Sequence, residues 1–193
     1  MTGAIGLFGG TFDPPHFGHL ALARAALAAL DLERVVFVVA NDPWQKSTVR
    51  AVTPSSIRWE LVVAALDGED AMVPSDVEIG RGGPSYTIDT VEDLAGGDVP
   101  VALLLGADAA AGLNTWHRAD ELRARVRIAV AARPGATSPV PAGWDAVAVP
   151  MEPVDISSSE IRRRCAAREP FAELVPPGVA VLIAEHGLYG FGR

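Results

Sequence analysis

Two histidines, His16 and His19, stand three residues apart immediately before a predicted helix. At a helix N-terminus, where backbone N–H groups carry partial positive charge, two imidazoles at this spacing can point towards one bound anion. Gly9 and Gly10 precede them and allow a ligand to approach the backbone closely. The same spacing permits metal binding, but no nearby Cys or Glu completes a ligand set. Taken by itself, the pair fits phosphate binding and helix capping by one histidine equally well.

A second polar cluster lies far away in sequence, in the segment 156–162, which reads Ile-Ser-Ser-Ser-Glu-Ile-Arg. Serines at a helix start can cap free N–H groups and donate hydrogen bonds to a phosphate. Arg162 follows Ser158 by four residues, which places both on one helical face, and a guanidinium suits a pair of phosphate oxygens. A capped helix with a solvated arginine is the alternative interpretation. Arg163 and Arg164 are expected to project elsewhere, as surface residues.

Three further stretches carry residues that could recognise a second ligand. The segment 83–87, Gly-Pro-Ser-Tyr-Thr, lies at a predicted helix start, whose N–H groups and hydroxyls suit a carboxylate. Trp116 follows a predicted strand and a Gly-Ala-Asp turn, where its indole could stack on a heteroaromatic ring. Lys46 follows the second predicted strand and could reach a phosphate. Taken singly, these stretches also fit a helix cap, a core tryptophan and a surface loop.

The elements that must position these residues alternate between strands and helices. The apolar run 4–8 predicts a buried strand, the helical spacing of apolar residues over 20–30 an amphipathic helix, and the β-branched run 35–40 a central parallel strand. Strand, helix, strand is the βαβ unit, with a right-handed crossover. Further strands are expected at 101–105, 127–131 and 147–149, short extended pieces at 72–73 and 77–79, and helices at 54–65 (capped by Thr53), 87–94, 158–167 and 179–186.

This alternation predicts the α/β class, a doubly wound parallel sheet of the Rossmann-like type. No internal repeat or linker divides the chain, so residues 1–193 are expected to form one domain, with the last helices, about 156–190, completing the phosphate-binding site. Pro134 to Pro141 is expected to be a surface loop. Ligands of such sheets bind at the carboxyl ends of the strands, near the point where strand order reverses.

Composition limits the remaining classes of protein. The formal charge of −8 argues against non-specific nucleic-acid binding, which needs a basic face. Cys165 is the only cysteine, so no internal disulfide can form and a reducing compartment is expected. No apolar run approaches the ~20 residues that span a bilayer. We therefore expect a soluble, cytoplasmic protein with no nucleic-acid or membrane partner.

The string Gly-x-Phe-Asp-Pro followed by His-x-Gly-His, after an N-terminal apolar strand, resembles the nucleotidyltransferase superfamily with the HxGH signature. The segment 156–162 is similar to the I-S-S-T-x-x-R motif of that superfamily, with Ser159 in place of threonine. The resemblance implies that both histidines contact ATP phosphates and stabilise the transition state at the α-phosphate, and that the serine and arginine hold the β- and γ-phosphates. The ATP site that it implies comprises Gly9, Thr11, Phe12, His16, His19, Gly106, Asp108, Ile156, Ser157, Ser158 and Arg162.

From about Ile5 to Tyr189 the chain resembles, within that superfamily, the bacterial-type nicotinate mononucleotide adenylyltransferases. The Gly-Pro-Ser-Tyr-Thr turn, and the tryptophan eight residues after Asp108, carry this narrower resemblance. It implies AMP transfer from ATP, accompanied by Mg²⁺, to nicotinate mononucleotide, with no metal held by protein residues. Its implied catalytic residues are His16, His19, Lys46 and Arg162, and its acceptor-binding residues are Gly10, Lys46, Ser85, Tyr86, Thr87, Trp116 and Arg133.

One departure from the family pattern and several rival functions stay open at this point. The loop Pro43–Lys46 reads Pro-Trp-Gln-Lys where Pro-Pro-His-Lys is commoner, which leaves the role of Trp44 undefined. A phosphopantetheine adenylyltransferase is disfavoured, since that acceptor has neither a ring for Trp116 nor a carboxylate for Tyr86 and Thr87. A non-catalytic nucleotide sensor is disfavoured by the intact histidines, Lys46 and Arg162. A dinucleotide-dependent dehydrogenase is disfavoured by the missing G-x-G-x-x-G pattern. A homo-oligomer stays open.

Overall fold

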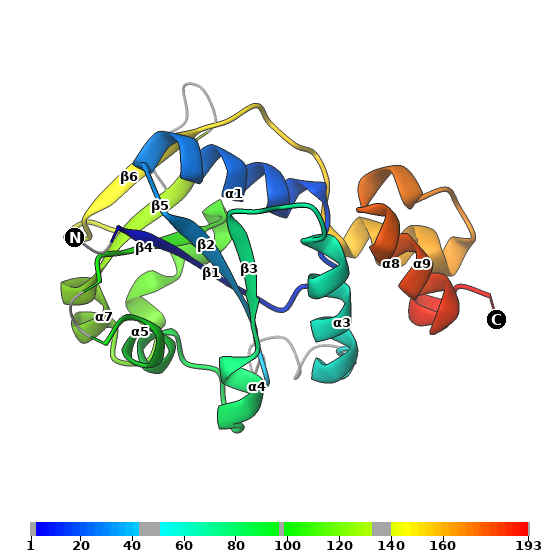
Figure 1. The fold of residues 1–193 in the computed structure, drawn as a ribbon, viewed down its shortest axis with the longest axis horizontal. Helices are drawn as coiled ribbons and strands as arrows, with labels where there is room; N and C mark the ends of the chain where they lie inside the picture. Colours follow the sequence, from blue (N-terminus) through cyan, green and yellow to red (C-terminus); the bar gives the residue numbers. More distant parts are fainter. Residues whose placement is uncertain (1–2, 43–50, 97–98, 133–139, 193) are drawn as a thin grey trace.

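The computed structural model describes residues 3–42, 51–96, 99–132 and 140–192. Six parallel strands form one sheet in the order β3-β2-β1-β4-β5-β6 (Figure 1). Their bounds are β1 Ile5–Gly10, β2 Arg34–Val39, β3 Met72–Ser75, β4 Val101–Leu105, β5 Val126–Ala132 and β6 Ala146–Pro150. This is the doubly wound Rossmann-like order, so the predicted fold class is confirmed.

The strand order reverses at β1, which pairs with β2 on one side and β4 on the other. From β1 the chain runs outward to β2 and β3, and after returning to β4 it runs outward to β5 and β6. Gly9 and Gly10 end β1 beside Val38 and Val39 of β2, and Gly106 follows the end of β4. The carboxyl ends of these strands therefore form the edge where a doubly wound sheet binds ligands.

Helices cover both faces of the sheet because successive residues of each strand point to opposite faces. On one face, α1 (Phe17–Leu30) and α3 (Ser55–Ala65) pack Leu20, Ala23 and Val62 against Phe37 and Leu104. The opposite face packs against α5 (Thr87–Ala95), α6 (Ala107–Ala111), the 3₁₀ turn η1 (Leu113–Thr115) and α7 (Ala119–Arg125). Both core clusters are formed by the alternating faces of the same strands, as expected of a central parallel sheet.

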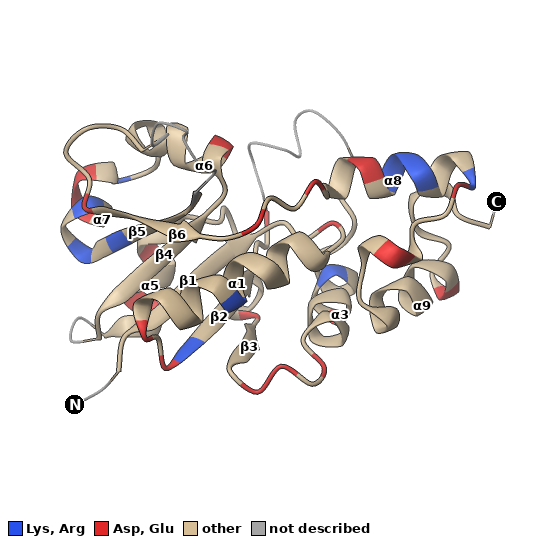
Figure 2. Cartoon of the chain, turned by 90° about the horizontal axis from the view of Figure 1, so that it is seen from above, with Lys and Arg blue, Asp and Glu red and all other residues tan. Residues whose placement is uncertain are grey.

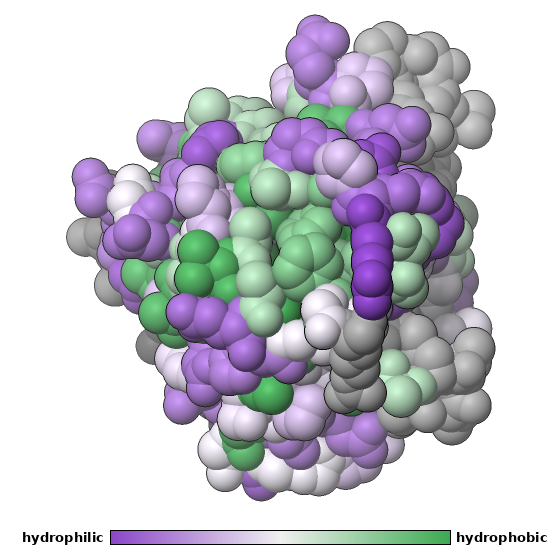
Figure 3. Space-filling view, turned by 90° about the vertical axis from the view of Figure 1, so that its right-hand side faces the viewer, coloured by the Kyte–Doolittle hydropathy of each residue, from purple (hydrophilic) through white to green (hydrophobic). Residues whose placement is uncertain are grey.

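The C-terminal elements form a third apolar cluster at the edge of the sheet. They are α8 (Ser158–Ala167), η2 (Ala172–Leu174), α9 (Pro177–Glu185) and η3 (Leu188–Gly190). Leu61 and Ala65 of α3 pack against Ile161 of α8 and Ile183 of α9, so α3 belongs to two cores. In Figure 1 these helices lie at the end of the molecule opposite the N-terminus, and the space-filling view of that end shows apolar surface flanked by hydrophilic residues (Figure 3).

Two local predictions are wrong. Residues 77–79, expected to be extended, belong to the short helix α4, Val77–Arg81, which ends at Gly82 with a φ of 71°. The buried Glu78 of α4 accepts a hydrogen bond of 2.6 Å from Thr90 of α5, a tertiary contact that outweighs the β propensity of valine and isoleucine. The N-cap of α3 is Pro54, not Thr53. Six residues of the expected loop Pro134–Pro141 lie outside the described residues.

Candidate active site

The loop between β1 and α1 is held in one conformation by its own aromatic residue. Phe12 is buried and has a φ of 48°, a region that residues other than glycine rarely adopt. Its ring packs against Phe8, Phe37 and His19 at centroid distances of 5.6, 5.5 and 5.1 Å. A Cβ on Gly10 would lie 2.8 Å from that ring, so glycine is required there. Gly9, by contrast, is exposed with open space at the Cβ position, where a ligand could approach the backbone.

The two histidines meet at the start of α1. His16 is the N-cap residue, and its backbone N–H donates to Nδ1 of His19 at 3.1 Å. Their ring centroids are 3.7 Å apart. Because Nδ1 of His19 accepts, the proton of its neutral ring lies on Nε2. A Cβ on Gly18 would lie 3.0 Å from Nδ1 of His16, which explains the glycine of the motif. His16 therefore caps α1 and also lies with its ring against that of His19.

Burial controls the charge of His16. Its side chain is 7% exposed, and desolvation lowers its pKa from 6.5 to about 4. Within the described part of the chain, its Nδ1 is buried without a hydrogen-bond partner. A buried polar atom left unpaired costs free energy, and such atoms mark sites where function outweighs stability. At neutral pH His16 is thus an uncharged imidazole.

The distant serine–arginine segment reaches the same loop. Ser158 Oγ donates to the carbonyl of Pro14 at 2.8 Å, and Arg162 Nη1 donates to the carbonyl of Asp13 at 2.7 Å. Both side chains thus project from one face of α8 towards the β1–α1 loop, as their spacing predicted. The peptide bond between Asp13 and Pro14 is cis. The histidine motif and the serine–arginine motif therefore lie next to each other in the folded protein.

The other residues around the start of α8 have distinct structural positions. Ser157 is the N-cap and accepts from the N–H of Glu160 at 3.2 Å, while Ile156 packs against the C-terminal apolar cluster. Arg163 and Arg164 both pair with Glu160, at 2.8 and 2.9 Å, and these partners raise the pKa of each guanidinium. Their expected surface role is confirmed. Figure 2 shows this concentration of charge on α8.

Gly106 and Asp108 lie at the carboxyl end of β4, next to β1 at the reversal of strand order. Gly106 is the N-cap of α6, and Asp108 lies in the first turn of that helix. Both are exposed, and a Cβ on Gly106 would meet nothing within 4 Å. The structure therefore leaves this backbone open at the edge of the sheet that carries Gly9.

Three of the residues expected to bind the acceptor, Ser85, Tyr86 and Thr87, lie at the start of α5 or just before it. Tyr86 is the N-cap of α5 and Thr87 its first residue, so the first N–H groups of the helix have no acceptor within it. The ring of Tyr86 stacks on His117 at a centroid distance of 4.1 Å, which places the neighbouring Trp116 on the same side of the core. Arg118, next to His117, forms ion pairs with Asp89 and Glu92 of α5 at 3.1 and 3.0 Å.

A surface cavity of about 550 Å³ borders Trp116. Its lining combines Trp144 with charged residues of α7 and its N-cap, among which Arg118 pairs with Glu121 and Arg123 with Asp120. Ser85, Tyr86 and Thr87 are not part of the lining. The lining thus contains no residue of α5, but Arg118, which borders the cavity, pairs with Asp89 in the first turn of that helix.

The segment 83–87, expected to bind the acceptor, is hydrogen-bonded to the loop after β2. Ser85 Oγ accepts from the N–H of Asn41 at 2.9 Å, and Asn41 Nδ2 donates to the carbonyl of Gly83 at 3.0 Å.

Lys46 and Arg133, expected to contact phosphate, lie outside the described residues, as does Trp44. Among the described residues no group of three or more His, Cys, Asp or Glu side chains could hold a metal ion. The helices described are also too short or too polar to cross a membrane.

Three residues of this region were not predicted from the sequence. Tyr189 donates to Asp13 Oδ1 at 2.8 Å, and burial raises its pKa well above the usual range. His117 stacks on Tyr86, and Arg58 is buried between two loops. The position of Arg58 on an otherwise apolar helical face was a signal in the sequence. Tyr189 and His117 belong to no motif that would have indicated a role for them.

Comparisons with known proteins agree with this geometry. The model of the cytidylyltransferase-like family matches residues 7–164. Relatives named probable nicotinate-nucleotide adenylyltransferase include one from Bordetella petrii, 44% identical over 96% of this chain and 98% of the relative. Another, from Shouchella clausii, is 43% identical over 96% of each chain.

A solved structure shows the same fold. Plasmodium falciparum nicotinic acid mononucleotide adenylyltransferase, complexed with NaAD, has a TM-score of 0.77 at 16% identity and covers 98% of both chains. The extent of these matches, together with the HxGH loop and the serine–arginine helix at one sheet edge, shows that the chain belongs to the cytidylyltransferase-like family, among the nicotinate-nucleotide adenylyltransferases.

Proposed function

We propose that the protein transfers AMP from ATP to nicotinate mononucleotide, producing nicotinate adenine dinucleotide and pyrophosphate. The observation that carries the proposal is the meeting of His16 and His19 with Ser158 and Arg162 on one loop, at the sheet edge where strand order reverses. The names of the relatives support the choice of acceptor.

In the proposed reaction, an oxygen of the acceptor's 5′-phosphate attacks the α-phosphorus of ATP. The new bond joins that oxygen to phosphorus, the bond to the α–β bridging oxygen breaks, and its electron pair leaves with pyrophosphate. No covalent intermediate on the protein is needed, so positioning and charge stabilisation carry the catalysis. His19 donates from Nε2 and His16 acts as a neutral donor, both towards oxygens of the α-phosphate as its charge develops.

Ser158 and Arg162 are assigned to the pyrophosphate end of ATP. Both now donate to backbone carbonyls of the loop. Arg162 has further donor capacity because its guanidinium carries five N–H groups in a fixed fork, whereas the single O–H of Ser158 has to turn from Pro14 towards a phosphate oxygen. Lys46 is assigned to the phosphates between donor and acceptor, and Gly106 and Asp108 to the adenosine side. Thr11, Phe12, Ile156 and Ser157 complete the ATP site through backbone and packing.

Trp116 is assigned to the pyridine ring and the N–H groups of Tyr86 and Thr87 to its carboxylate, with Gly10, Ser85 and Arg133 completing the acceptor site. Mg²⁺ is proposed to enter with ATP and to neutralise phosphate charge, held by phosphate oxygens and water, as this cation prefers. The residues described contain no carboxylate cage for it, so the proposal assigns it no protein ligand set.

A direct assay tests the proposed function. Purified protein is incubated with ATP, Mg²⁺ and nicotinate mononucleotide, and pyrophosphate and the dinucleotide are quantified. The two products should appear in equal amounts and only with both substrates present. Phosphopantetheine as acceptor serves as the comparison. Turnover with phosphopantetheine alone, or ATP binding without turnover of either acceptor, would contradict the proposal.

A further inference from the structure

A fully buried arginine lies behind the candidate active site. Arg58, on α3, is 1% exposed and belongs to the largest completely buried side chains of the described structure. Burying a guanidinium is costly unless its N–H groups are hydrogen-bonded in good geometry. An apolar side chain of similar volume would fill the same space without that cost. The charge at this position therefore calls for an explanation beyond packing.

Each of the three nitrogens of Arg58 donates to a different segment of backbone. Nη1 donates to the carbonyl of Thr11 at 2.9 Å, in the loop that leads to the histidines. Nη2 donates to the carbonyl of Asn41 at 3.1 Å, in the loop that follows β2. Nε donates to the carbonyl of Thr53 at 2.8 Å, just before α3. One rigid planar group thus sets the spacing of these segments.

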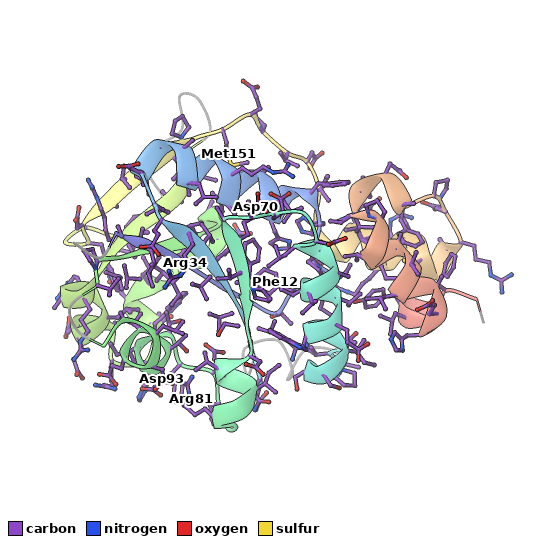
Figure 4. All side chains as sticks on the ribbon, viewed as in Figure 1. Phe12, Arg34, Asp70, Arg81, Asp93 and Met151 are labelled. Carbon is purple, nitrogen blue, oxygen red and sulfur yellow. The ribbon has the colours of Figure 1, made fainter. Side chains whose placement is uncertain are left out.

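The contact with Asn41 extends to the acceptor segment. Asn41 donates from its backbone N–H to the hydroxyl of Ser85 and from its side chain to the carbonyl of Gly83. The N–H of Ser85 in turn donates to the carbonyl of Asp42 at 3.4 Å. A continuous series of hydrogen bonds therefore runs from the segment before α5, through Arg58, to the β1–α1 loop. Phe12, next to Thr11 in that loop, lies beside α3 in Figure 4.

We propose that Arg58 is a positioning residue for adenylyl transfer, which sets the distance between the loop that holds the ATP α-phosphate and the segments that hold the acceptor. This inference rests on the proposed function. In-line attack requires the two phosphates at near-contact distance, and a misplacement of about 1 Å can cost on the order of 10²-fold in rate. Each substrate keeps its own binding residues when Arg58 is removed, so the loss falls on the step that needs both.

The test uses Arg58→Ala and Arg58→Lys, with Arg34→Ala as the matched control. Arg34 begins β2 at the opposite edge of the sheet, where it is exposed and pairs with Glu33 (Figure 4). We expect kcat to fall by on the order of 10²-fold in Arg58→Ala, while the Kd of ATP and of nicotinate mononucleotide, each titrated alone, changes less than about threefold. Arg58→Lys keeps the charge but not the fork, so it should recover little of kcat.

Chemical rescue separates positioning from loss of fold. Guanidinium ion at millimolar concentration should raise kcat of Arg58→Ala about tenfold or more, without affecting the wild type or Arg34→Ala. Unchanged kcat in both Arg58 variants would overturn the inference. So would a loss of activity that only follows the folded fraction measured by melting, or a loss confined to ATP affinity. An inactive wild type would overturn the proposed function, and with it this inference; an active wild type with fully active variants overturns the inference alone.

Discussion

His16 combines a helix-capping position with a buried neutral ring. Its pKa of about 4 lies below the 6.5 of the unfolded chain, so between these values the unfolded chain binds a proton that the folded chain does not. The free energy of unfolding should therefore fall as pH falls from 6.5 towards 4. A shift of this size corresponds to roughly 3 kcal/mol when fully developed.

His16→Gln, which cannot ionise, should lack this component of the pH dependence. Chemical denaturation of both proteins at pH 7, 5.5 and 4.5 measures it, and the wild type should lose more stability than the variant. Parallel losses would show that another group causes the acid sensitivity.

His19 differs from His16 in its assigned hydrogen-bond role. Its Nδ1 accepts from the backbone of His16, which leaves Nε2–H as the donor that the proposed mechanism needs. His19→Ala removes one preorganised donor and should lower kcat by roughly 10²–10³, with little change in KM for ATP. Steady-state kinetics at saturating acceptor check this. An effect on KM with unchanged kcat would restrict His19 to ground-state binding.

At the scale of elements, the start of α5 should determine the choice of acceptor. The first N–H groups of α5, which have no acceptor within the helix, favour a carboxylate over an amide, which would present N–H to N–H. We expect kcat/KM for nicotinate mononucleotide to exceed that for nicotinamide mononucleotide by about tenfold or more, the equivalent of one hydrogen bond.

Trp116→Phe provides the control for that comparison. An aromatic ring stacks on the pyridine without reading its substituent, so the variant should weaken both acceptors alike and keep the preference. Equal or reversed kcat/KM values in the wild type would remove the assignment of the Tyr86–Thr87 turn.

At the scale of the whole molecule, the C-terminal turn η3 contacts the loop between β1 and α1. Tyr189 of η3 donates to the buried carboxylate of Asp13, across 176 positions of sequence. Tyr189→Phe removes this bond and should lower the free energy of unfolding by about 1 kcal/mol. Thermal melting measures the change. Tyr86→Phe is the control, because Tyr86 is half buried like Tyr189 but its hydroxyl makes no hydrogen bond among the residues that the structure describes. A Tm equal to that of the wild type would show that the bond adds no net stability.

Much of the fold follows from the sequence. The prediction was accurate to within one residue for the run 35–40, which forms Arg34–Val39, for the apolar run Val101–Leu105 and for the helix Ser158–Ala167. It was accurate because burial on both faces and helical periodicity are local patterns. Val77–Arg81 was mispredicted because a short segment has too little pattern, and its contact with α5 decides its structure.

The sequence by itself determined which residue types stand in the two motifs and at what spacing. From these it predicted phosphate chemistry, since type and spacing define which groups can face one phosphate. For the glycines of the first loop, it gave only the general reason that a residue without a side chain lets a ligand approach the backbone. Tertiary structure decided that Gly18 makes room for His16 and Gly10 for Phe12, and that Ser158, Arg162 and Tyr189 converge on one loop. It alone revealed Arg58 as the link between the loops, because a buried guanidinium is defined by carbonyls that are distant in sequence. Spacing along the chain specifies local faces, whereas only packing brings remote backbone groups within hydrogen-bonding distance.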